Sequence, residues 1–124
     1  MAEREFSEAF LRFIESCVPN FDAAELLLFF SRHADRSWRV DEIAEAIRPA
    51  DITAARIRDC VALFKSRGLI SEASDSYQFA PHSEEMRDAV AALNRAYEER
   101  PVTLIRTINT MADSKLKSFA DSFK

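Results

Sequence analysis

The sequence predicts a mainly helical single domain that carries one small β-hairpin. Apolar residues recur three and four positions apart through most of the 124 residues, which is the spacing of one helix face. One glycine and four prolines leave few positions for turns. The single glycine, Gly68, precedes two short segments in which residues alternate as they do in strands. A chain of this length that is 48% hydrophobic suits one domain, residues 1–124, with an apolar core.

Two helices are predicted in the first third of the chain. Residues 6–18 repeat apolar side chains at helical spacing, and Pro19 ends the stripe. The segment that starts at Phe21 is apolar on nearly every side, which is typical of a central helix covered by its neighbours. Asn20 and Asp22 are the two candidates for its N-cap, because both side chains can accept a hydrogen bond from the first turn.

A short extended segment and two further helices follow. Residues 37–40 alternate in polarity and are predicted to form a brief strand or an extended linker. Residues 41–47 have the spacing of a short helix, which must end at Arg48 because a proline comes next. Asp51 is the expected cap of the following helix, residues 52–67.

Gly68 is predicted to stop that helix. It follows a basic last turn with Lys65 and Arg67, the usual place for a glycine in the left-handed conformation. Residues 69–80 then alternate in polarity on either side of a polar turn at Asp75–Ser76, which predicts a hairpin.

The helical pattern that begins at Ser83 carries an apolar stripe with spacings of four, three and four, as in a coiled-coil seam, and Pro101 kinks or restarts the helix. An apolar stripe of this length predicts an interaction site, and two-fold dimers are the commonest assemblies. The sequence therefore predicts a homodimer. The alternative is that both terminal helices pack within one chain and complete a monomer. The predicted dimer residues are Met86, Val90, Leu93, Tyr97, Leu104 and Ile108.

The order of these elements is that of a winged helix-turn-helix domain. The stretch "SWRVDEIAEAIRPADITAARIRDCVALFKSRGLISEASDSYQFAP" resembles the core of winged helix-turn-helix bacterial transcription regulators, including the MarR type. Its most specific part, "VALFKSRGLI", is similar to the recognition helix of that family as it runs into the wing. The resemblance covers residues 21–81, which are the predicted winged core. The helical patterns on either side add an N-terminal helix in residues 1–20 and a C-terminal helical extension in residues 82–124.

The resemblance also implies binding of double-stranded DNA, with residues 41–47 as the supporting helix and 52–67 as the recognition helix. The second of these carries four basic residues and one acidic residue, a local charge of +3 in a chain of net charge −4. Arginine is well shaped for guanine or phosphate. The expected DNA-contacting residues are Thr53, Ala54, Arg56, Arg58, Lys65 and Arg67.

The hairpin around Asp75 is the wing that the resemblance implies. It departs from the DNA-binding pattern, because Glu72 and Asp75 would meet phosphate with like charge. A protein–protein interaction module without DNA binding is therefore the alternative function, with Arg56 and Arg58 as an ordinary solvated helix face. A third reading is a ligand-sensing regulator with an apolar pocket between the terminal helices and Phe29 or Phe30. The DNA target, the effector and the direction of regulation are not encoded in any recognisable motif.

No enzyme, metal site or cofactor is predicted. Cys17 and Cys60 lie far apart among apolar residues, which predicts buried free thiols in a reducing compartment. His33 and His82 lack the spacing of a metal pair and are expected at the surface or at a helix cap. The chain starts without the features of a signal peptide, and its longest apolar run, residues 26–30, is too short to span a bilayer. A cytoplasmic protein without a membrane partner is expected.

Overall fold

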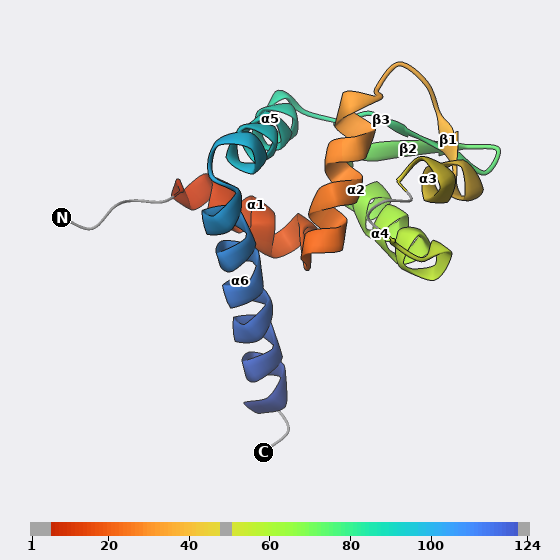
Figure 1. Cartoon of the computed structure of the whole chain (residues 1–124). Coiled ribbons are helices and arrows are strands. Elements are labelled where there is room, and N and C mark those ends of the chain that lie inside the picture. Colours follow the sequence, from red (N-terminus) through yellow and green to blue (C-terminus); the bar gives the residue numbers. More distant parts are fainter. Residues whose placement is uncertain (1–5, 48–50, 122–124) are drawn as a thin grey trace.

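The structure, a computed structural model, describes residues 6–47 and 51–121, with side chains as far as Asp113. The expected turn at Arg48 and Pro49 lies outside the described residues. Six helices and one three-stranded sheet occupy these ranges, so the prediction of a mainly helical chain with a small hairpin is confirmed (Figure 1). The helices are α1 (Glu8–Cys17), α2 (Phe21–Arg32), α3 (Val40–Ala46), α4 (Ala54–Ser66), α5 (Glu84–Glu99) and α6 (Pro101–Asp121), and the strands are β1 (Trp38–Arg39), β2 (Ile70–Ala73) and β3 (Ser76–Phe79).

Helix α2 is the centre of the core, as its apolar composition predicts. Asn20 is its N-cap, with the side-chain oxygen accepting a hydrogen bond from the backbone N–H of Ala23 at 2.9 Å. The helix packs against α4, α5, α6 and β3, so it is covered on several sides (Figure 1). Its buried residues are Ala23, Ala24, Leu26, Leu27, Leu28 and Phe30.

The N-cap of α4 differs from the one that the sequence predicted. The N-cap of α4 is Thr53, whose hydroxyl accepts from the N–H of Arg56 at 3.2 Å, and not Asp51. Thr53 has the extended backbone that an N-cap needs, whereas Asp51 lies two residues earlier at a φ of 55°. Pro101 restarts the helix and does not kink it, because α5 ends at Glu99 and the proline opens α6, where its missing N–H costs nothing.

The strands form an antiparallel sheet in the order β1-β3-β2. Residues 38 and 39 do form a strand, with Trp38 paired to Tyr77. The hairpin turn lies at Ser74–Asp75, one residue earlier than expected. Both turn residues have positive φ, 51° and 66°, as a two-residue turn between twisted strands requires. Sequence polarity alone did not distinguish between these adjacent positions.

Gly68 ends α4 as predicted, with a φ of 76°. It also makes room for His82, because a Cβ at this position would lie 2.3 Å from the ring atom Nδ1 of His82. The backbone N–H of His82 donates to the carbonyl of Gly68 at 2.9 Å, and Ala80 donates to Leu69 at the same distance. The glycine therefore fixes both the end of α4 and the base of the hairpin.

The apolar stripe that predicted a dimer lies mostly inside one chain, as the monomer alternative expected. Val90 is 2% exposed, and Leu93, Leu104 and Ile108 are fully buried. Met86 and Tyr97 are half-buried and pack against the same core. Helices α5 and α6 fold back on α1 and α2 and cover the stripe, so these four buried side chains are not on an outer face of the folded chain.

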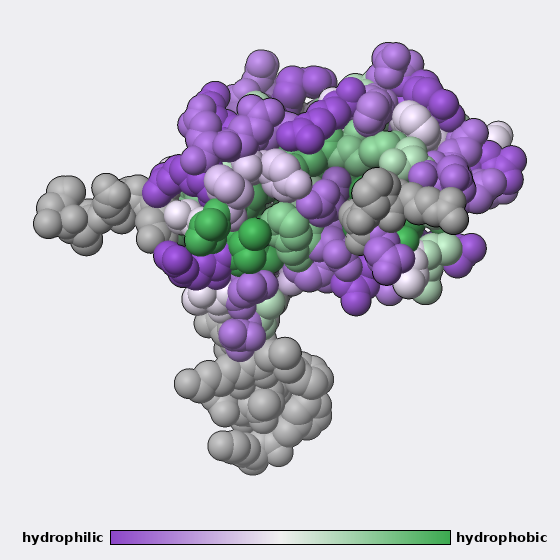
Figure 2. Space-filling model, viewed as in Figure 1, coloured by the Kyte–Doolittle hydropathy of each residue, from purple (hydrophilic) through white to green (hydrophobic). Residues whose placement is uncertain are grey.

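The outer face of α6 is where large apolar side chains reach the surface. Among the described residues, Val102 and Ile105 are the exposed large hydrophobics, at 65% and 37% of their surface. Figure 2 shows hydrophobic surface near the start of α6 and a second hydrophobic band above it, with hydrophilic residues around both. The second half of α6 extends away from the rest of the chain (Figure 1).

Cys17 and Cys60 are both buried free thiols, as predicted. Burial raises the pKa of Cys60 to about 11 and raises that of Cys17 as well. Both are therefore protonated and unreactive near neutral pH.

Replacing Gly68 by alanine should lower the free energy of unfolding by at least about 1–2 kcal/mol, the cost of placing a Cβ in the left-handed region. Contact with His82 adds to this cost. Urea denaturation measures the loss. The double variant Gly68→Ala with His82→Ala removes the contact but keeps the backbone strain, so it should recover part of the stability. An unchanged denaturation midpoint for Gly68→Ala would contradict this account of the glycine.

Candidate nucleic-acid interface

Helix α4 is held by one face and leaves the other free. Its inner residues are buried, and the helix packs on α2, α3 and β2. The free face combines small residues such as Ala55 and Ala62 with charged ones, so the helix backbone is accessible to a large partner. The exposed side chains of this face are Ala55, Arg56, Arg58, Asp59, Ala62 and Lys65.

The structure separates the six predicted contact residues into different roles. Thr53 is the N-cap, so its hydroxyl is engaged with the backbone of the first turn, and Ala54 is half-buried. Arg56, Lys65 and Arg67 each have a partner within the chain. Arg58 makes no ion pair or hydrogen bond with any residue that the structure describes.

Arg56 is paired with Asp22 from the first turn of α2. Its Nη1 lies 3.1 Å from Oδ2 of Asp22, and both side chains are a little under half exposed. An ion pair with this exposure is weak and open to exchange, on the order of 1 kcal/mol or less. It nevertheless cancels one positive charge of α4 in the free protein.

Lys65 is paired with Glu72 on β2. Its Nζ lies 2.6 Å from Oε1 of Glu72, whose Oε2 accepts a hydrogen bond from the hydroxyl of Tyr77 at 3.4 Å. The hydrogen bond and the charge of Lys65 lower the pKa of Glu72, and Glu72 raises the pKa of Lys65. The pair ties the end of α4 to the hairpin. With Asp22 and Glu72 included, the local charge of residues 52–67 falls from +3 to +1.

Arg67 ties α4 to the N-terminal helix. Its Nε donates to the backbone carbonyl of Ser16 at 3.0 Å, near the C-terminal end of α1. A carbonyl in the last turn of a helix has no partner within that helix, so the guanidinium satisfies it. Arg67 is therefore engaged in holding two helices together.

Arg58 opens onto a hollow of about 450 Å³ between α4, the start of α3 and the sheet. Arg39 of β1 and Tyr77 of β3 line the same hollow, together with two acids, Asp41 and Asp75. Two arginines from strand and helix thus share one concave surface. The lining residues are Arg39, Val40, Asp41, Arg58, Asp75 and Tyr77.

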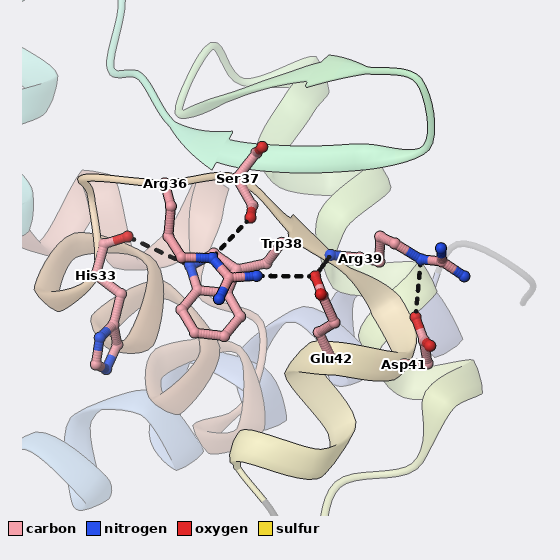
Figure 3. A network of polar contacts seen from close by, with 7 residues as sticks. All are labelled: His33, Arg36, Ser37, Trp38, Arg39, Asp41 and Glu42. Atoms are coloured by element: carbon pink, nitrogen blue, oxygen red, sulfur yellow. Dashed lines mark hydrogen bonds and ion pairs between the residues drawn. The ribbon is translucent and has the colours of Figure 1, made fainter.

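Arg39 was missed as a candidate in the sequence. It alternates with Trp38 in the strand, so it had to face away from the side on which the tryptophan packs. Figure 3 shows the two side chains pointing apart, with Arg39 beside Asp41. The Nε of Arg39 lies 3.2 Å from Oδ1 of Asp41, and the two side chains are 63% and 71% exposed, so this ion pair is weak.

Glu42 fixes the position of Arg39. Its Oε1 accepts from the backbone N–H of Arg39 at 2.9 Å and from Nη2 of Arg36 at 3.0 Å (Figure 3). The guanidinium of Arg36 in turn lies 3.7 Å from the ring centroid of Trp38, within cation–π range. Strand β1 is therefore held at the start of α3 by contacts that leave the side chain of Arg39 outward.

Trp38 anchors the strand from the other side. Its ring packs against Phe29 of α2 with centroids 4.8 Å apart, and its Nε1 donates to the carbonyl of His33 at 3.3 Å.

His33 is the C-cap of α2 and His82 is exposed beside Gly68, so both histidines lie where they were expected.

The rest of the described structure was searched for a metal site, a membrane span and a ligand pocket. In the described part of the chain, no three His, Cys, Asp or Glu residues are grouped so that they could hold a metal ion. No helix within residues 6–47 and 51–121 has the length and apolarity needed to cross a bilayer. An apolar hollow of about 430 Å³ lies between α1 and α5, with Phe10, Phe13 and Met86 among its lining residues. Neither Phe29 nor Phe30 lines it, contrary to the expected position of a ligand pocket.

Comparison of the chain with known protein families, with curated proteins and with solved structures finds no match. A function therefore has to be inferred from the residues of this chain.

The Lys65–Glu72 ion pair should make stability depend on pH. Because the pKa of Glu72 is lowered from its ordinary value of 4.5, the pair stabilises the fold above that value and loses its effect as the pH falls through the lowered pKa. The effect is lost again as the pH rises through the raised pKa of Lys65. Urea denaturation of the parent and of Glu72→Gln should therefore differ more at pH 6 than at pH 3.

Glu99→Gln is the matched control, because Glu99 is exposed at the end of α5 and has no ion pair with the described residues. Its effect should not vary in this way. If the stability difference between the parent and Glu72→Gln is the same at pH 6 and pH 3, the Lys65–Glu72 ion pair does not stabilise the fold.

Proposed function

We propose that this protein is a transcription regulator of the winged helix-turn-helix type that binds double-stranded DNA through the free face of α4. The order of elements, the packing of α3 on α4 and the sheet order β1-β3-β2 support the proposal. The observation that carries it is Arg58, whose guanidinium has no ion pair with the described residues, lies on the free face of α4 and shares a hollow with Arg39.

The free face of α4 suits the major groove of DNA. Ala55 and Ala62 are exposed and small, so they let the helix approach base edges closely. Arg58 has the planar fork that pairs with guanine or with a phosphate. Arg39 has only a weak exposed partner, so a phosphate can replace Asp41 at little cost.

The hairpin has a different role in this proposal. Residues 69–80 contain no lysine or arginine, and the turn carries Asp75, so the hairpin offers no cation to a phosphate. Attraction to DNA is then local to α4 and β1 in a chain of net charge −4, and binding should weaken steeply with salt. A bacterial regulator of this type acts in the cytoplasm. This compartment is reducing, so the thiols of Cys17 and Cys60 stay reduced there.

A protein-interaction module on the same scaffold is the second candidate. It is favoured by the pairing of Arg56 with Asp22 and of Lys65 with Glu72, because these contacts reduce the positive charge that α4 offers to phosphate. The acidic hairpin turn at Asp75 would then be the docking surface for a basic partner.

Arg58→Ala should weaken binding to DNA by roughly 1–3 kcal/mol and lower the slope of log K against log salt by about 1, because it removes one cation at the interface. Fluorescence anisotropy with labelled genomic DNA fragments at about 50 mM and about 200 mM salt measures both quantities. Arg95→Ala is the matched control, since Arg95 is exposed on α5 and is likewise unpaired with described residues.

Two results would reject DNA binding through α4. One is the absence of DNA retention by the parent protein at the lower salt concentration. The other is an equal effect of Arg58→Ala and Arg95→Ala. Either result makes the interaction module the better account of α4.

A further inference from the structure

Asp22 is fixed at the start of α2 by its neighbours in that helix. Asn20 caps the helix through the backbone N–H of Ala23 at 2.9 Å. The ring of Phe21 stacks on that of Tyr97 on α5, with centroids 6.0 Å apart. A carboxylate in the first turn of a helix is also favoured by the helix dipole. The position of Asp22 therefore does not depend on its ion pair with Arg56.

The side chain of Arg56 can exchange its partner, because a single contact holds it. Its Nη1 lies 3.1 Å from Oδ2 of Asp22, and 45% of the side chain is exposed. The guanidinium has no other ion pair or hydrogen bond with the described residues. Rotation about the side-chain bonds can therefore move it from Asp22 to a bound anion while α4 stays in place.

Arg56 lies at the end of α4 where DNA contacts are expected. It is the third residue of the helix, and the N-terminal residues of a recognition helix are the ones that reach base edges. The pair between Lys65 and Glu72 lies at the other end of α4, and Glu72 also accepts from Tyr77, so that pair belongs to the hairpin. Asp22 is thus the acid that competes with DNA for the N-terminal end of α4.

We propose that Asp22 is a specificity residue of this surface, which keeps Arg56 from the phosphates of arbitrary DNA and releases it only to a better acceptor. This inference rests on the DNA binding proposed for α4. A single phosphate offers Arg56 a charged oxygen acceptor, as Asp22 already does, so the exchange gains little. A guanine presents two acceptors, N7 and O6, that match the guanidinium fork. Binding to arbitrary sequences is then weaker by the contact that Arg56 does not make.

The test is the binding of duplex DNA of random sequence, measured by fluorescence anisotropy at about 50 mM and about 200 mM salt. Asp22→Asn frees Arg56 for a phosphate. The dissociation constant at the lower salt concentration should therefore fall at least about threefold, and the slope of log K against log salt should steepen by about 1. The double variant Asp22→Asn with Arg56→Gln keeps the net charge of −4 and lacks the freed cation, so both quantities should return to the parent values.

Asp88→Asn is the matched control, because it changes the net charge by the same amount on α5. Asp88 is exposed there and has no ion pair with the described residues. Its replacement should leave both the affinity and the salt slope unchanged. Circular dichroism verifies that each variant is folded. Asp22→Ala also removes the carboxylate and takes the place of Asp22→Asn if that variant does not fold.

The role of Asp22 is overturned if its replacement does not tighten binding to random DNA, or if Asp88→Asn tightens binding equally. If Arg58→Ala still weakens binding in that case, DNA binding through α4 stands and only the role of Asp22 fails. If neither the parent nor Asp22→Asn binds DNA at the lower salt concentration, the proposed function fails and the role of Asp22 fails with it.

Discussion

The burial of α2 is the constraint on which the rest of the structure depends. Leu26, Leu27 and Phe30 are fully buried, and each such side chain contributes about 1.5–3 kcal/mol when it leaves water. A helix with apolar residues on several sides must be covered on those sides, so the other elements gather around it. Helices α4, α5 and α6 and strand β3 each pack against α2, and their outer faces are left for other roles.

The outer faces differ because of where their charges find partners. On α4, Asp22 and Glu72 reach across from α2 and β2 and occupy Arg56 and Lys65. Arg58 lies between these two residues in the sequence and makes no ion pair with any residue that the structure describes. Within the described residues this face offers one guanidinium without an ion pair beside small side chains, so it attracts anions only weakly, and the proposed binding would be confined to one surface of a net acidic protein.

Local patterns in the sequence predicted the order of elements well, because helix stripes, the apolar α2 and the helix stop at Gly68 depend on neighbours within a few residues. The cap of α4 was misplaced because both Asp51 and Thr53 have suitable side chains and only the backbone distinguishes them. The pair between Arg56 and Asp22 joins residues 34 positions apart, so no local pattern reveals it. The stripe on α5 and α6 was correctly identified as apolar, but periodicity alone does not tell whether a face is covered by its own chain or by another.

The central claim is that α4 and β1 form the DNA-binding surface, and amide chemical-shift mapping with duplex DNA tests it most directly. On addition of DNA at low salt, the account predicts shifts concentrated in residues 53–66 and at Arg39, with the outer surface of α5 unaffected. Shifts confined to the hairpin turn or to the hollow between α1 and α5, or no shifts at all, would contradict it.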